Sequence, residues 1–192
     1  MSLRPEQIKA RQYLDRKGSR LTAAQLRDRV GAAFAAIEEA LGSVEAQAAR
    51  GRAIPGEWSV QEVVDHLVET HRPSIAELRD LLSGRRPEGP PIPAGLQSAD
   101  PMAPDWATLV GELKALQGEA LGLLGAVPDG YATDARAPLV MVINVKEPDG
   151  SETPLHWIEE LDWKAYAIVF RLHVLDHLSQ IRKTLAAARA GR

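Results

Sequence analysis

The sequence predicts an all-α protein, a four-helix bundle formed by a single domain over residues 1–192. Two observations favour this fold class. Alanine and leucine are abundant while aromatic residues make up only 5% of the chain, a balance that favours helix over sheet. Four long segments also carry apolar residues at steps of three and four, the period of a helix with one buried face. Four such segments joined by loops can bury their apolar faces together as a bundle.

The chain is expected to begin with an extension, residues 1–20, that precedes the bundle and contains a short charged helix over residues 4–17. The first bundle helix follows. Thr22 can cap its amino terminus, and Gln25, three residues later, completes a capping box. We expect this helix to continue to about residue 49.

The second bundle helix has the clearest start in the sequence. Ser59 can cap it, and Glu62 completes the S-x-x-E capping box, while Trp58 can pack against Val63 as a hydrophobic staple. The apolar pattern of this helix continues to about residue 82.

A stretch rich in proline and glycine, residues 83–104, separates the second and third helices and is predicted to lack regular structure. Loops of this length are uncommon inside compact domains and are often functional, so this loop is a candidate cover for a site. Asp105 can then cap a third helix that extends to about residue 127.

The segment before the last helix changes character. Residues 139–145 form a largely β-branched run, and the turn signal P-D-G at residues 148–150 follows it, which indicates a strand and a small β-hairpin. A run this short does not by itself distinguish strand from helix. The last helix is expected to begin between Pro154 and Leu161.

The last helix contains the most suggestive feature of the chain, two histidines at residues 173 and 177. Residues at i and i+4 lie one above the other on a helix, so both imidazoles leave the same face. A helical wheel places them on the inward side, opposite a charged stripe that should face water and consists of Glu160, Lys164, Arg171, Arg182 and Arg189. A second apolar sector indicates either deep burial or a subunit contact, hence a homodimer, and consists of Leu161, Ile168, Leu172 and Leu175.

Composition excludes several classes of protein. The chain has no cysteine, so disulfides, cysteine ligands and cysteine nucleophiles are excluded. Its 23 basic and 26 acidic residues are nearly balanced and form no long basic run, which argues against a nucleic-acid partner. Neither a secretory signal nor a membrane-spanning apolar segment is recognisable, so a cytoplasmic protein without a membrane partner is expected.

His173 and His177 are candidate metal ligands. Three neutral imidazoles around a divalent ion leave a coordination position open for water or substrate, which is the arrangement of a catalytic site. The third ligand would come from the second helix, where the candidates are His71 and His66. The apolar pattern favours His71, which lies at the middle of the buried face. The alternative is that each histidine is a half-buried packing residue bonded to a carbonyl.

Two motifs add to this interpretation: G-E-W-S-V-Q-E-V-V-D-H-L-V-E-T-H at residues 56–71 and H-V-L-D-H-L-S-Q-I at residues 173–181. In both, the sequence resembles the DinB/YfiT-like family of metal-binding four-helix bundles, and the resemblance extends in helix order over about residues 20–190. It implies that the metal ligands are His66, His173 and His177. It also implies that His71 has a role in the core or behind the ligands.

The resemblance further implies a metal-dependent enzyme that acts on a small-molecule substrate, either a hydrolase or a transferase that uses a low-molecular-weight thiol. The metal would be nickel, zinc, iron or manganese, and any thiolate would have to arrive as a separate molecule. Candidates for contacts with the ligands or the substrate are Asp176, Gln180, Tyr166, His71 and His156. The alternative function is a non-catalytic dimeric bundle that binds a small molecule or a partner, with a metal that is structural or absent.

Overall fold

The structure, a computed structural model, describes residues 3–18, 20–147 and 149–190. Its main body is a bundle of four long helices, which confirms the predicted fold class. These are α2 (Ala23–Leu41), α4 (Val60–Leu82), α5 (Trp106–Gly125) and α6 (Trp163–Ala190). The remaining elements are helix α1 (Pro5–Gly18), the short helix α3 (Ala46–Arg50) and an antiparallel hairpin of β1 (Ala137–Lys146) and β2 (Glu152–Leu161).

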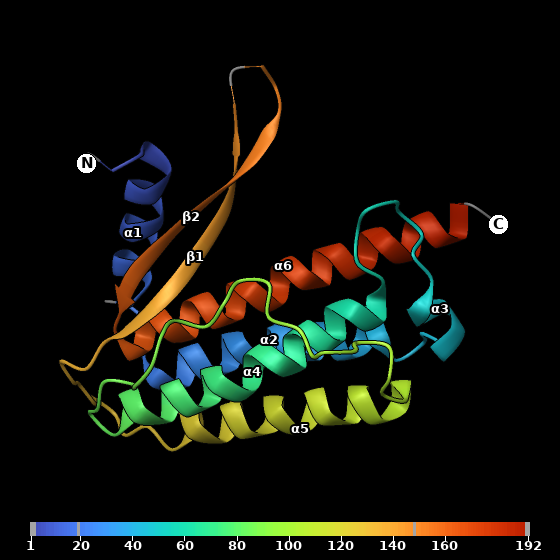
Figure 1. The fold of residues 1–192 in the computed structure, drawn as a ribbon. Helices are drawn as coiled ribbons and strands as arrows, with labels where there is room; N and C mark the ends of the chain where they lie inside the picture. The colour runs from blue at the N-terminus through green and yellow to red at the C-terminus, as the bar shows by residue number, and fades with distance from the viewer. Residues whose placement is uncertain (1–2, 19, 148, 191–192) are drawn as a thin grey trace.

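The helices of the bundle do not simply alternate in direction. Figure 1 shows α2 and α6 running one way and α4 and α5 running the other way. The ion pairs Arg72–Glu112 and Arg79–Glu119 both join residues 40 apart, as expected for two parallel helices in fixed register. Because α4 and α5 are parallel, the chain between them must return along the whole bundle, and the proline-rich loop makes this crossover.

The predicted starts of the first and second bundle helices agree with the structure, but the predicted end of the first bundle helix is wrong. Thr22 and Ser59 both form complete capping boxes. Helix α2 ends at Leu41 and does not continue to about residue 49, because the chain turns at Gly42, whose amide bonds back to the carbonyl of Glu38. The short helix α3 then forms separately.

The hairpin also changes where the last helix begins. The predicted strand is confirmed as β1, and its partner β2 pairs with it in register from Lys146↔Glu152 to Ala137↔Leu161. Residues 154–161 therefore belong to a strand, and α6 begins only at Trp163. Asp162 marks this start, since its carboxylate accepts a hydrogen bond of 2.8 Å from the amide of Ala165. Pro148, within the predicted turn, lies outside the described residues.

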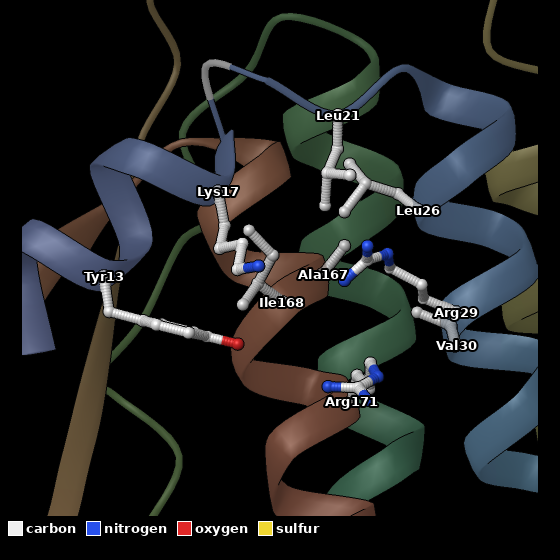
Figure 2. Close-up of a pocket in the computed structure, with 9 residues that line it drawn as sticks. All are labelled: Tyr13, Lys17, Leu21, Leu26, Arg29, Val30, Ala167, Ile168 and Arg171. Carbon is white, nitrogen blue, oxygen red and sulfur yellow. The ribbon is translucent and has the colours of Figure 1, made fainter.

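Helix α1 packs against α6 and alters the exposure of the predicted charged stripe (Figure 2). Arg182 and Arg189 are exposed as expected, whereas Lys164 and Arg171 are only half-exposed because α1 and the following turn lie over them. The ammonium of Lys164 donates to the carbonyl of Leu21 over 2.9 Å. None of the described helices combines the length and the apolarity that crossing a bilayer requires.

Candidate metal centre

Three histidines from two helices converge inside the bundle. His66 lies on α4, and His173 and His177 lie one turn apart on α6, which packs against α4. The Nε2 atom of His173 is 3.0 Å from Nε2 of His66 and 3.1 Å from Nε2 of His177. One ring nitrogen from each residue thus lies within 4.8 Å of the other two.

Hydrogen bonds on the opposite ring edges determine which nitrogens are free. The Nδ1 atom of His66 is 2.7 Å from the carbonyl oxygen of Leu96, and Nδ1 of His177 is 2.9 Å from Oε1 of Gln180. Both partners are acceptors, so both Nδ1 atoms must carry the proton. The Nε2 atoms of His66 and His177 are therefore left with lone pairs that face His173.

The environment also keeps the three rings uncharged. The pKa of His66 is lowered to about 4, mainly by burial and in addition by the neighbouring His177, while the bond to the Leu96 carbonyl opposes the shift. Burial likewise lowers the pKa of His177, and it brings the pKa of His173 well below the usual range. All three imidazoles are neutral near pH 7, which is the form that binds a metal.

A divalent cation fits this arrangement better than hydrogen bonding among the rings alone. A proton on Nε2 of His173 can be donated to only one of the two lone pairs that face it, whereas a cation would satisfy all three nitrogens. Two nitrogens bound to a tetrahedral zinc ion at about 2.0–2.1 Å lie about 3.4 Å apart, close to the separations found here. In the described part of the chain no carboxylate joins this cluster, so the donor set is three imidazoles.

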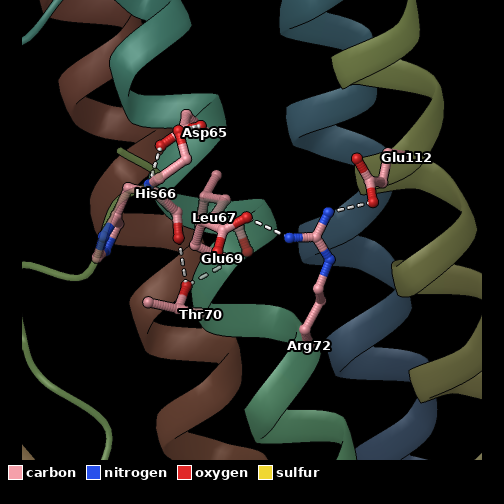
Figure 3. Close-up of polar contacts among 8 residues, drawn as sticks. Asp65, His66, Leu67, Glu69, Thr70, Arg72 and Glu112 are labelled. Atoms are coloured by element: carbon pink, nitrogen blue, oxygen red, sulfur yellow. Dashed lines mark hydrogen bonds and ion pairs between the residues drawn. The ribbon is translucent and has the colours of Figure 1, made fainter. Parts of the chain in front are cut away.

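The side chains of His66 and Arg72 leave α4 on different sides. Figure 3 shows the ring of His66 leaving α4 on the side away from Arg72, which reaches across to Glu112 on α5 and also pairs with Glu69. The hydroxyl of Thr70 donates to the carbonyl of His66 over 2.7 Å. The capping box at Ser59 fixes the first turns of α4, so it also fixes the position of His66 two turns later.

Trp58 forms one wall of the histidine cluster, a role that was not predicted from the sequence. Its ring stacks on that of His177 at 13° with centroids 6.4 Å apart, and its centroid is 5.1 Å from that of His66. The sequence suggested instead a staple against Val63. The one signal in the sequence was its spacing, because Trp58 precedes His66 by eight residues, about two turns, along the same segment.

The proline-rich loop is attached to the cluster side of α4. Besides the Leu96 carbonyl on His66, the carboxylate of Asp65 accepts bonds from the amide and the hydroxyl of Ser98, at 2.9 and 2.6 Å. The amide group of Gln97 donates to the carbonyl of Glu62 over 2.9 Å. The loop thus holds His66 in place, and no side-chain pattern could reveal this because the contact uses a backbone oxygen.

Of the other residues predicted to contact the ligands or the substrate, some lie near the histidine cluster and others lie outside it. Gln180 contacts His177, as described above. Tyr166 is buried two turns from His173, and its hydroxyl donates to Glu77 over 2.5 Å. His71 is fully buried between Phe34 and Phe170, outside the cluster. Asp176 is exposed on α6 and His156 is exposed on β2, and the structure brings neither into the cluster.

Comparison with known proteins identifies the family and supports the fold. The family model of the DinB superfamily matches residues 9–161, a span that includes His66 and ends before α6. Among solved structures, YfiT from Bacillus subtilis superposes with a TM-score of 0.61 at 18% sequence identity, over 88% of this chain and 87% of that one. It is described as "a probable metal-dependent hydrolase with an unusual four-helix bundle topology", and at this identity the likeness shows the fold. No curated protein matches the sequence.

Proposed function

Because this chain belongs to the DinB superfamily, we propose that it is an enzyme that binds one divalent metal ion through His66, His173 and His177. The observation that carries the proposal is the convergence of three neutral ring nitrogens, two of them with lone pairs fixed by hydrogen bonds at Nδ1. Such a site supports catalysis because three protein ligands leave room for a further ligand.

The bound ion would lower the pKa of a coordinated water or thiol and would polarise an electrophilic substrate. The residues of the chain orient the ligands and shape the space beside them. The Leu96 carbonyl and Gln180 hold two rings in the tautomer that presents Nε2. Trp58 provides an apolar surface beside the ligands, which limits the access of water and offers a flat contact for a substrate.

Two reaction classes use the same site and differ in their nucleophile. In hydrolysis the nucleophile is water, as in the activity ascribed to YfiT. In thiol transfer it is a low-molecular-weight thiol, which must be added because the chain contains no cysteine. Zinc, nickel, iron and manganese are the candidate metals, and the substrate is a small molecule.

Metal analysis tests the ligand assignment. We expect wild-type protein purified without chelator, or reconstituted with the four candidate metals in turn, to contain about one ion per chain. The double variant His173→Ala/His177→Ala should contain none. His156→Ala is the matched control, because it removes an exposed histidine outside the cluster and should leave the metal content unchanged. Wild-type protein that takes up no metal under any of these conditions would refute the proposal.

Activity assays distinguish the reaction classes. Activated esters should be hydrolysed without thiol if the protein is a hydrolase, and an electrophile should be consumed only with added thiol if it is a transferase. Either activity should disappear on chelation and return when metal is restored.

The alternative is a non-catalytic homodimer in which any metal only holds α4 and α6 together. The observation in its favour is that Leu172 and Leu175 on α6 remain partly exposed, as do Val142 and Ile158 on the hairpin. Sedimentation measurements would test the dimer, and a metal that stabilises the fold without any turnover would favour this alternative over the enzyme.

A further inference from the structure

A second candidate site lies in a pocket between α1, α2 and α6. Figure 2 shows Tyr13 and Lys17 of α1, Arg29 of α2 and Arg171 of α6 directing their polar ends toward a common space. The remaining lining is apolar: Leu21, Leu26, Val30, Ala167 and Ile168. The enclosed part of this space has room for about one water-sized atom, so a larger ligand would place a single atom there and would otherwise lie at the open mouth, among the polar ends of these side chains.

The pocket concentrates positive charge that nothing in the described chain neutralises. Lys17, Arg29 and Arg171 form no ion pair there, and no described acidic residue lines the pocket. Several surface arginines elsewhere pair with carboxylates, among them Arg11 with Glu159, Arg79 with Glu119 and Arg86 with Glu160. Three uncompensated cations around an apolar floor produce a local positive potential that attracts an anion.

Arg171 supplies an independent observation. Its Nε–H is buried and finds no acceptor among the described residues. Burying a donor without a partner is unfavourable, so structures normally satisfy it with protein, water or a ligand. The hydroxyl of Tyr13 is a further donor at the same opening.

We propose that this pocket binds a phosphate group, carried either by inorganic phosphate or by a small phosphorylated molecule. A guanidinium group presents a planar pair of donors that matches two phosphate oxygens, and the lysine ammonium adds a point charge. The bound group, with a charge of about −1.5 to −2, would offset most of the charge of the three cations and accept the bond that Arg171 lacks. Because Lys17 and Tyr13 come from α1, binding also joins this helix to α2 and α6.

Titration calorimetry with sodium phosphate, at ionic strength held constant with sodium chloride, tests the site. We expect saturable binding by the metal-loaded wild-type protein with a dissociation constant below about 1 mM. Arg29→Gln and Arg171→Gln should each weaken binding by about tenfold or more. The matched control is Arg182→Gln, which removes the same charge from an exposed position on the same helix as Arg171 and should bind like wild type.

Two further measurements distinguish a phosphate site in this pocket from purely structural arginines and from phosphate bound at the metal centre. In phosphate-free buffer, Arg29→Gln should melt at the same temperature as wild type or higher, because it removes a repelling charge, whereas loss of a purely structural arginine would lower the melting temperature. Phosphate bound at the metal centre would survive both arginine substitutions, and that result would overturn the proposal. So would the absence of saturation at about 10 mM phosphate.

A comparison of two ligands identifies the source of the phosphate group. Tighter binding of glycerol 3-phosphate than of inorganic phosphate would identify a phosphorylated molecule as the ligand, and the reverse order would identify free phosphate.

Discussion

His71 and His66 lie five residues apart on α4 but have different surroundings. His66 bonds to a loop carbonyl and faces the histidines of α6. His71 is packed between Phe34 and Phe170, at centroid distances of 6.0 and 4.5 Å, and neither of its ring nitrogens has a hydrogen-bond partner among the described residues. His71 is therefore a polar side chain held in an apolar position, which is energetically costly.

Replacing His71 by leucine should stabilise the protein and reduce its sensitivity to acid. The pKa of His71 is lowered to about 3, mainly by burial and in addition by the charges of His66 and His177, while the nearby carbonyl of Leu67 opposes the shift. Since the folded pKa is below the unfolded value, the unfolded state binds more protons between about pH 6.5 and 3, and stability falls as the pH falls through this range. His71→Leu should gain about 1 kcal/mol at pH 7. It should also lose about 2 kcal/mol less than wild type on going to pH 5.

Urea unfolding of the metal-free proteins at both pH values would measure this. The metal content of His71→Leu should stay at the wild-type level. If His71→Leu loses its metal, this would instead support His71 as the third ligand, the assignment that the apolar pattern favoured.

Gln180 should tune metal affinity through His177. Its Oε1 accepts the Nδ1 proton of that ring, and groups that orient a ligand in this way typically contribute ten- to a hundredfold in metal affinity. Gln180→Leu should weaken binding by about that factor without unfolding the protein. Competition with a chromogenic chelator measures the effect, and Asp176→Asn, at an exposed position on the same helix, should show no change.

The histidine cluster was only partly predictable from residue patterns. The i and i+4 spacing correctly placed His173 and His177 on one face. The helical wheel favoured His71 over His66 because it measures the centre of an apolar face, whereas the structure brings to α6 the histidine at the margin of that face. The contacts of Leu96 and Trp58 with the cluster were not predicted. Leu96 acts through its backbone carbonyl, and Trp58 had been interpreted as a hydrophobic staple at the start of α4.

At the scale of elements, the proline-rich loop and α4 should act as one unit. Asp65 binds both the amide and the hydroxyl of Ser98, so Asp65→Ala should release this part of the loop from the helix. Leu96 would then hold His66 less firmly. We expect faster proteolytic cleavage within residues 83–104 and weaker metal binding. Asp129→Ala, at an exposed position beyond α5, is the control and should change neither.

Element boundaries were predictable where a local signal determines them. The hydroxyl and carboxylate caps at Thr22, Ser59 and Asp105 appear as expected, because each depends on residues within one turn. The start of α6 was misplaced because residues 152–161 are held as a strand by β1, a contact outside their own sequence. Arg171 was assigned to solvent for a similar reason, since the packing of α1 was not evident from its own charged sequence.

At the scale of the whole molecule, the order and directions of the helices could not be read from amphipathic periods, which carry no information on direction. The length of the proline-rich loop was the one indication of a crossover. In the structure this crossover makes α4 and α5 parallel and brings Leu96 to His66. The same topology places α4 beside α6, so ligands 107 residues apart in the chain meet at one point.

Metal binding should therefore stabilise the entire bundle. The ion would join α4 to α6, and the separated ligands of an unfolded chain would bind it far more weakly, so the gain is set by the affinity of the folded state. At a free metal concentration of about one hundred times the dissociation constant this gain is about 2.7 kcal/mol. For a chain of this length that corresponds to a rise of about 5–10 °C in melting temperature. Calorimetric melting with and without chelator measures the difference, and His173→Ala/His177→Ala should melt at one temperature in both buffers. An equal response of wild type and double variant would mean that metal binds elsewhere.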